Sequence, residues 1–260
     1  MNQSRFHNAP PASHNQVTQS GFTLVEISIV MIIIGLLIGG IFGGMKLIDN
    51  ASVQRTVQDI KAIDTAIITF RDTYRALPGD IRNPSTRIPD CTTAPCATSG
   101  NGDRTIGVPE SGVLPITSAS ENYTFWHHLS ASDILSMGYK NTTDMNFGEG
   151  TPDTAIGGGF RIQHSTIAQA CRMGGTGPWT GTPPRRSGHR VVITGAHNGR
   201  TDTSLTISCL QIMALDQKID DGFAVTGEVK GIYCSSLVTF ACEYDAAQSN
   251  GVAYIDFKGL

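Results

Sequence analysis

Charge is scarce in this sequence, and the charges of opposite sign nearly cancel. Of the 260 residues, 19 are Lys or Arg and 22 are Asp or Glu, so the net charge is -3. Proteins that bind nucleic acid gather basic residues on one face and are usually strongly positive. Because this chain has no such excess, we expect no nucleic-acid partner.

Charge is entirely absent from residues 27–45, which are mostly apolar. A segment of this length is able to cross a bilayer, because a transmembrane helix needs roughly 17–25 apolar residues. Proline, which breaks helices, does not occur between Phe22 and Tyr74. In the second half of this stretch the apolar residues recur every three or four positions, which predicts an amphipathic continuation of the helix. They are Val53, Val57, Ile60, Ile63, Ile67, Phe70 and Tyr74.

The predicted helix ends before Leu77-Pro78-Gly79-Asp80, a sequence typical of a turn. At the usual rise per residue it would be about 80 Å long, much longer than a bilayer is thick. We therefore expect its first half to lie in lipid or another apolar sheath, and its second half to pack on a globular head. Five glycines of the first half either permit close helix packing or reflect the ordinary glycine content of membrane helices. They are Gly35, Gly39, Gly40, Gly43 and Gly44.

The segment before the apolar run lacks the features of an ordinary secretory signal. Residues 1–21 are polar, hold Arg5 as their only Arg or Lys, and have no apolar core. The cationic signal that would orient the helix in a membrane is therefore weak. The next residues, Phe22-Thr23-Leu24-Val25-Glu26, place a carboxylate just inside the apolar segment. An ionised carboxylate there costs several kcal/mol unless it has a partner, so Glu26 is a candidate functional residue.

The motif Gly21-Phe22-Thr23-Leu24-Val25-Glu26 resembles the processing site of type IV prepilins and type II secretion pseudopilins. The resemblance extends over about residues 20–74. Shorter segments of the head look like those of bacterial pilin-like proteins often labelled type II secretion system proteins. These segments are residues 76–80, 100–103, 126–129 and 215–222.

The resemblance implies a structural filament subunit, without a cofactor, and not an enzyme. Prepilin peptidase would cut between Gly21 and Phe22, and the new amine of Phe22 would be methylated. The methylated amine stays cationic, so it would pair with the Glu26 carboxylate of a neighbouring subunit. An assembly ATPase and a platform protein would then draw the chain out of the inner membrane into a filament of pilin-like subunits.

The same resemblance implies a membrane topology and a type of filament. The leader would lie in the cytoplasm and the head in the periplasm, and the filament would be the pseudopilus of a type II secretion system. One alternative is a minor pilin of a type IV pilus. An alternative of another class is a signal-anchored periplasmic enzyme or binding protein, which would keep residues 1–21 and would not need Glu26.

The expected organisation is a leader at residues 1–21, a transmembrane part of the helix at 22–47, an amphipathic part at 48–76 and a head at 77–260. In the head, apolar periodicity predicts helices over residues 124–137 and 207–219. Alternating and β-branched residues predict strands over 160–164, 190–194, 229–233 and 252–257. The fold class is therefore α+β, with an antiparallel sheet packed on the second half of the long helix, as in type IV pilins.

All the cysteines follow the apolar segment. They are Cys91, Cys96, Cys171, Cys209, Cys234 and Cys242. An even number on the exported side predicts disulfides, and six cysteines allow fifteen pairings. The pairs closest in sequence, Cys91 with Cys96 and Cys234 with Cys242, are candidates for short loops. That choice leaves Cys171 for Cys209, and a reduced buried thiol at Cys209 is the alternative.

The histidines do not form a recognised metal motif. Because they lack the spacing of a zinc site, we expect surface or capping roles for them. They include His127, His128, His164, His189 and His197. Catalytic motifs, such as Gly-x-Ser-x-Gly or a phosphate-binding glycine loop after a strand, do not occur either.

A calcium site is a minor alternative for the loop around Asn101 and Asp103. These residues, with Asp80 and Asp90 upstream, offer oxygen ligands. The loop does not match the twelve-residue calcium pattern, because Ile106 stands where Gly is needed and no Glu closes it. A turn rich in Asn, Asp and Gly explains the same residues without a metal.

Overall fold

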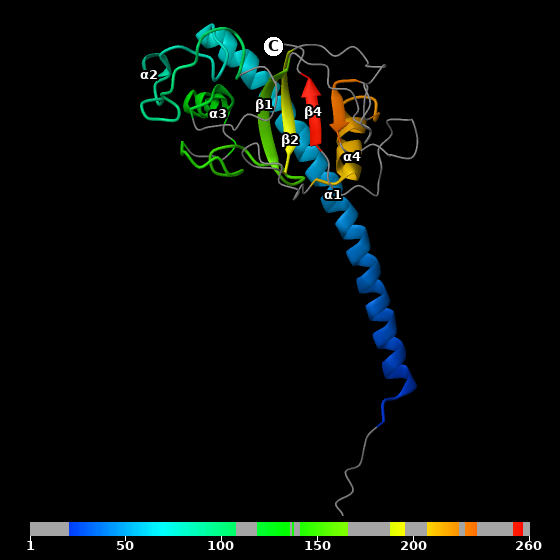
Figure 1. The fold of residues 1–260 in the computed structure, drawn as a ribbon. Helices are drawn as coiled ribbons and strands as arrows, with labels where there is room; N and C mark the ends of the chain where they lie inside the picture. The colour runs from blue at the N-terminus through cyan, green and yellow to red at the C-terminus, as the bar shows by residue number, and fades with distance from the viewer. Residues whose placement is uncertain are drawn as a thin grey trace, which may run out of the picture. The chain divides into compact units, whose positions relative to one another are not determined.

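The computed structural model describes residues 21–107, 119–135, 137, 141–165, 188–195, 207–223, 227–232 and 252–256. The chain divides into two compact units, residues 1–46 and residues 47–260, which we call the N-terminal and the C-terminal unit. Each unit is described by itself. The predicted α+β class is confirmed, since a long N-terminal helix is followed by an antiparallel sheet and shorter helices (Figure 1).

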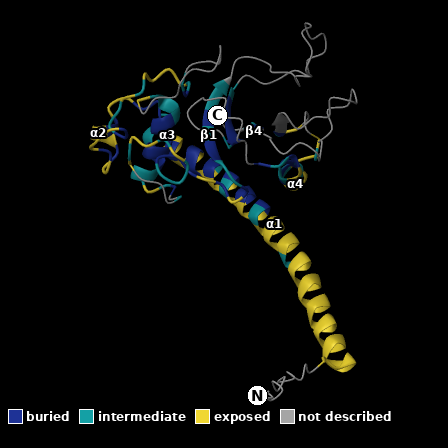
Figure 2. Cartoon of the chain, turned by 60° about the horizontal axis from the view of Figure 1, so that its bottom comes forward, coloured by how far each residue is buried: buried dark blue, intermediate teal, exposed yellow. Residues whose placement is uncertain are grey.

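Helix α1 runs from Leu24 to Tyr74, close to the predicted bounds. Within the C-terminal unit its buried face comprises Val53, Thr56, Val57, Ile60, Ile63, Ala66, Ile67 and Phe70. Figure 2 shows this change along the helix, from an almost entirely exposed first half to a second half with one buried face. The helix ends because Arg75 adopts a left-handed conformation, with φ 53°. The guanidinium of Arg87, in the short helix α2 (Pro84–Arg87), donates to the carbonyl of Tyr74.

The sheet has four strands in the order β1-β2-β4-β3, and all neighbours are antiparallel. The strands are β1 (Gly159–Ser165), β2 (Gly188–Thr194), β3 (Val229–Ile232) and β4 (Val252–Asp256). Each lies where the sequence pattern predicts a strand. The register of the strands places apolar residues opposite one another, as for Phe160 with Ile193 and Val191 with Ile255. These strands and the buried face of α1 contribute to one hydrophobic core.

Helix α3 spans Glu121–Ala131, so the prediction of a helix over residues 124–137 was wrong at both ends. Ser120, with extended backbone, precedes a polar first turn that apolar periodicity does not detect. At the other end Asp133 adopts a left-handed conformation, with φ 56°. The N–H groups of Ile134 and Leu135 then donate back to the carbonyl of Leu129, at 3.3 and 3.2 Å, which ends the helix. The apolar residues after Ala131 therefore reach the core from a turn.

Helix α4 spans Cys209–Ile219 and begins with a reciprocal capping box. The N–H of Gln211 donates to Oγ of Ser208 at 3.2 Å, and the N–H of Ser208 donates to Oε1 of Gln211 at 3.1 Å. Helix α4 contacts β3, whereas α3 contacts β1. Since β1 and β3 are the outer strands of the sheet, the two helices pack at opposite edges of it (Figure 1).

Candidate functional site

The histidines of the C-terminal unit are largely interior, so the expected surface roles were wrong for several of them. His127, His128 and His189 are buried, and His164 is half-buried. His197 lies outside the described residues. For His127 and His128 the reason is that α3 has buried residues over most of its circumference. His127 Nδ1 lies 3.0 Å from the carbonyl of Tyr123.

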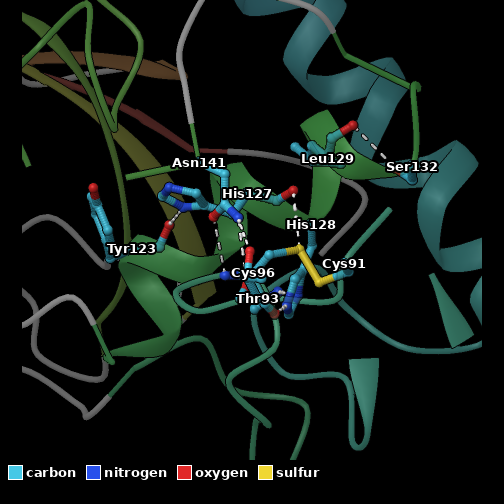
Figure 3. The surroundings of a disulfide bond; sticks show 10 residues. Cys91, Thr93, Cys96, Tyr123, His127, His128, Leu129, Ser132 and Asn141 are labelled. Carbon is cyan, nitrogen blue, oxygen red and sulfur yellow. Dashed lines mark hydrogen bonds between the residues drawn. A yellow bond between two sulfur atoms is a disulfide. The ribbon is translucent and has the colours of Figure 1, made fainter. Parts of the chain in front are cut away.

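His128 connects three segments of the C-terminal unit beside a disulfide bond (Figure 3). Its Nδ1 accepts the N–H of Gly79 at 2.8 Å. Nε2 therefore carries the proton and donates to the carbonyl of Cys96 at 2.9 Å. The ring also lies parallel to that of Phe70 in α1, at 6.4 Å between centroids. Burial lowers the pKa of His128 to about 4, so the ring is neutral at physiological pH.

The disulfide beside His128 joins Cys91 and Cys96, one of the two short loops predicted from the sequence. Asn141 holds this loop from outside: its Oδ1 accepts the N–H of Cys96, and its Nδ2 donates to Oγ1 of Thr93 (Figure 3). Although Cys91, Cys96 and His128 lie close enough to hold a metal ion, the two sulfur atoms are bonded to each other. The arrangement is therefore that of a structural disulfide.

Cys209 is also disulfide-bonded, which excludes the reduced thiol that was the alternative for it. Its partner is not among the described residues. Cys171, Cys234 and Cys242 all lie outside them. The pairings of Cys171 with Cys209 and of Cys234 with Cys242 stay predictions.

The loop around Asn101 and Asp103 is held by carboxylates that accept backbone N–H groups. Asp80 accepts from Gly102, Asp103 and Arg104, at 2.5, 3.1 and 2.8 Å. Glu121 accepts from the N–H of Asn101 at 3.0 Å and of Gly107 at 2.8 Å. Burial raises the pKa of both carboxyl groups.

The side chains of Asn101 and Asp103 also take part in this loop. Oδ1 of Asn101 accepts the N–H of Asp103 at 2.8 Å, and Oδ1 of Asp103 accepts the N–H of Thr105 at 2.7 Å. These contacts account for the Asn- and Asp-rich sequence as turn chemistry. Among the described residues, the acidic group close enough to hold a metal ion lies elsewhere, at Asp216, Asp220 and Asp221. Calcium binding at Asn101 and Asp103 stays a minor prediction.

The N-terminal motif forms a compact hydrogen-bonded group at the start of α1. Oε2 of Glu26 accepts the N–H of Thr23 at 2.8 Å and its hydroxyl at 2.7 Å. In return, the N–H of Glu26 donates to Oγ1 of Thr23 at 3.2 Å. This is a capping box, in which the first helical turn and the residue before it satisfy each other's polar groups. The helix therefore begins at Leu24, and the bond between Gly21 and Phe22 lies outside it.

The capping box is a feature that the sequence analysis missed. From the sequence, Glu26 is a carboxylate with no cation in its own helix before Lys46, and its role as a hydrogen-bond acceptor was not predicted. The spacing Thr-x-x-Glu directly before an apolar run is the known signature of such a box and could have revealed it. Glu26 therefore has a partner within its own chain before any neighbour arrives.

Within the N-terminal unit, the apolar part of α1 is exposed at every residue except Gly44, which is half-buried. Its most apolar 18-residue segment has a mean hydropathy of 2.7, and no residue of that segment is buried. By length and composition, it is the one helix of the described residues able to cross a membrane. A Cβ added at Gly35, Gly39 or Gly43 would meet nothing within 4 Å, so these positions are open. A surface of this kind must be covered by lipid or by other chains.

A family model described as the prokaryotic N-terminal methylation motif matches residues 17–42. The chain carries a type IV prepilin-like signal. The matched residues of this signal include Gly21, Phe22 and Glu26 and most of the exposed apolar helix. No curated protein and no solved structure matches the chain.

The prepilin-like signal and the α+β architecture agree with each other. A long apolar N-terminal helix followed by an antiparallel sheet is the pilin-like arrangement, and the signal covers the beginning of that helix. The chain is thus pilin-like in both respects. The motif is that of structural, pilin-like proteins, so its residues at the start of α1 are the candidate functional site.

Proposed function

We propose that the chain is a structural, non-enzymatic subunit of a type IV filament, most closely the pseudopilus of a type II secretion system. The observation that carries this proposal is the prepilin-like signal placed at the start of a long, uncovered apolar helix. The short head segments that look like type II secretion system proteins favour a pseudopilin over a minor pilin of a type IV pilus. A signal-anchored periplasmic enzyme or binding protein remains the alternative of another class.

Processing is the first step of the proposed function. Prepilin peptidase cleaves between Gly21 and Phe22 and methylates the amine of Phe22. The position of this bond supports the step, because the helix begins only at Leu24 and the Phe22 side chain is 84% exposed. A peptide bond outside regular structure enters a protease site without the cost of unwinding a helix.

Assembly is the second step, and it depends on Glu26. In the precursor the carboxylate is satisfied by Thr23, so insertion into the membrane does not require a cation beside it. In the filament the helices leave lipid and pack on one another, and the carboxylate then pairs with the methylated amine of a neighbour's Phe22. A charge buried without such a pair would cost several kcal/mol. The open glycine positions favour close packing of these helices.

Location follows from the same scheme. The precursor spans the inner membrane with its leader in the cytoplasm and its head in the periplasm. The disulfide between Cys91 and Cys96 supports a periplasmic head, since disulfides persist in oxidising compartments. The partners of the subunit are other pilin-like chains, prepilin peptidase, an assembly ATPase and a platform protein.

Intact-mass measurement of the full chain, purified from membranes of cells with and without prepilin peptidase, tests the proposal. We expect loss of residues 1–21 and one added methyl group only in cells that have the peptidase. Gly21→Ala should be cut at least in part because Ala is nearly as small as Gly, whereas Gly21→Leu should block the cut. Retention of the leader by the wild-type chain in cells with active peptidase would instead support the signal-anchored alternative.

A further inference from the structure

The loop of residues 100–107 contains the dipeptide Asn101-Gly102, and both residues are exposed. In such a pair the backbone nitrogen of the glycine is able to attack Cγ of the asparagine, because glycine has no side chain to block the approach. The products are a five-membered succinimide ring and ammonia. The rate of this reaction is set by the groups around the two residues, and here hydrogen-bonding groups lie on each of the reacting parts.

The side chain of Asn101 is folded over the peptide unit that follows it. Its Oδ1 accepts the N–H of Asp103 at 2.8 Å, and its Nδ2 donates to Oδ2 of Asp103 at 2.9 Å. A side chain bonded in this way to the residue two positions ahead forms a turn of its own, with Cγ beside the intervening nitrogen, that of Gly102. The N–H of Asp103 also lies where negative charge develops on Oδ1 during the attack, and it stabilises that charge.

The attacking nitrogen of Gly102 has a base beside it. Its N–H donates to Oδ1 of Asp80 at 2.5 Å. A carboxylate in this position is able to take the proton that the nitrogen must lose when it attacks. Asp80 is buried, and burial raises the pKa of its carboxyl group, which makes the carboxylate a stronger base.

A cation lies at the other end of the same peptide unit. The backbone carbonyl of Asn101 accepts the Nε–H of Arg82 at 2.7 Å, and Nη2 of Arg82 donates to it as well. Because the nitrogen and the oxygen of a peptide unit are joined by resonance, the negative charge left on the Gly102 nitrogen spreads to this oxygen. The guanidinium stabilises that charge, so Asp80 and Arg82 both favour loss of the proton.

We infer that Asn101 and Gly102 form a self-modifying site, at which Asn101 becomes aspartate or isoaspartate through a succinimide. Asp80 takes the proton of the Gly102 nitrogen, and this nitrogen forms a bond to Cγ of Asn101. The bond from Cγ to Nδ2 then breaks, and the amine leaves with the proton as ammonia. Water opens the ring at Cγ to give aspartate, or at the backbone carbonyl to give isoaspartate. This activity is separate from the proposed function and does not rest on it.

The product weakens the loop that carries it. In place of the Asn101 amide, which donates to Asp103, a carboxylate at position 101 faces the carboxylate of Asp103 and repels it. Isoaspartate also lengthens the backbone by a CH2 group, between N–H groups that Glu121 and Asp80 accept. The modification is therefore a one-way, time-dependent loosening of this part of the C-terminal unit.

Peptide mapping by mass spectrometry tests the inference on the full chain in detergent. The deamidated fraction at Asn101 is followed over time near neutral pH, in the folded chain and in the chain unfolded by urea. The same dipeptide at Asn198-Gly199 and Asn250-Gly251 gives the intrinsic rate in the unfolded chain. We expect Asn101 to react at least about ten-fold faster in the folded chain, since a positioned general base contributes this much or more. An equal or lower rate in the folded chain would overturn the inference, and so would aspartate formed without isoaspartate.

Three variants assign the rate to the named groups. Asp80→Asn removes the base and Arg82→Gln removes the cation, so each should lower the rate in the folded chain about ten-fold. Glu121→Gln is the matched control, because Glu121 holds the same loop through the backbone N–H of Asn101 at 3.0 Å and not through the Gly102 nitrogen. Its rate should stay close to that of the wild type.

The outcomes for these variants are distinct. Unchanged rates in Asp80→Asn and Arg82→Gln would overturn the chemistry assigned to the two residues. Equal slowing in all three variants would overturn it as well, because the order of the loop alone would then set the rate. If Asp80→Asn does not fold, Arg82→Gln decides, since Arg82 is exposed and its replacement leaves the core intact. None of these results depends on leader cleavage or filament assembly, so failure here leaves the proposed function standing.

Discussion

Acid should destabilise the C-terminal unit through His128. The imidazole is fully buried, and both its nitrogens are used, by the N–H of Gly79 and the carbonyl of Cys96. Above pH 6.5 the ring is neutral in the folded and the unfolded chain alike. Below that pH the unfolded chain takes up a proton while the folded chain, with a pKa of about 4, does not. Stability is therefore lost as the pH falls from 6.5 toward 4.

The gap between the two pKa values corresponds to about 3 kcal/mol when complete, of which about 2 kcal/mol falls between pH 7 and pH 5. His189 acts in the same direction, because its Nε2 accepts the N–H of Ile106 and its pKa is also lowered to about 4. Asp80 and Glu121 act in the opposite direction, since their raised pKa values let the folded chain keep protons that the unfolded chain has lost. A variant is thus needed to isolate the effect of His128.

His128→Gln provides that comparison, because glutamine does not titrate. Urea unfolding of the full chain in detergent, followed by tryptophan fluorescence, to which the buried Trp126 contributes, gives the free energy of unfolding at each pH. The variant should be less stable at pH 7 by about 1–3 kcal/mol because a buried hydrogen bond is lost. Its further loss between pH 7 and pH 5 should be smaller than that of the wild type by about 2 kcal/mol.

Equal losses for the wild type and His128→Gln would refute the reasoning. If the variant does not fold, NMR of the wild-type chain with labelled histidine answers the same question. A ring that takes up its proton near pH 6.5 in the folded chain would show that burial does not depress its pKa.

The remaining predictions concern Glu26, Gly79 and the disulfide bonds. Glu26→Ala should be cleaved and stay in the membrane but be missing from sheared filaments, as measured by immunoblot of the two fractions; normal assembly would show that the ion pair is not needed. Gly79→Ala should lower the free energy of unfolding by more than about 1 kcal/mol, because Gly79 has φ +85° and a Cβ there would lie 2.4 Å from the carbonyl oxygen of Glu121. Gly188→Ala, with nothing within 4 Å of its Cβ, is the control, and equal effects of the two would count against the reasoning. Replacing Cys91 and Cys96 together by Ser should cost about 2 kcal/mol, measured by urea unfolding. Peptide mapping without reduction should find this bond and also join Cys234 to Cys242, whereas free thiols at the latter pair would contradict that pairing.

The elements that follow from regular apolar patterns could be predicted from the sequence. Helix α1 is an uninterrupted case, since its apolar residues keep a helical period up to Tyr74 and no proline intervenes. The strands were found for the same reason, because β-branched residues cluster in short runs. The processing motif is equally local, as its six residues are adjacent in the chain.

The features that were missed depend on polar contacts or on distant residues. The end of α3 is set by the left-handed conformation of Asp133, which the spacing of apolar residues does not reveal. The burial of His128 depends on Gly79 and Cys96, which come from other segments of the chain. The carboxylate of Asp80 finds its donors more than twenty positions further along. Such contacts exist only once the tertiary fold has formed.

The loop of residues 100–107 has one further consequence, which concerns the order of folding. Its N–H groups are satisfied by Asp80, by Glu121 of α3 and by His189 of β2, at sequence separations of 22, 14 and 83 residues. None of these bonds can form until the turn, the helix and the strand have come together. Closing such long loops costs entropy, so we expect this segment to become ordered late. Its amide protons should exchange with solvent as one cooperative group, and their protection marks a head that has finished folding.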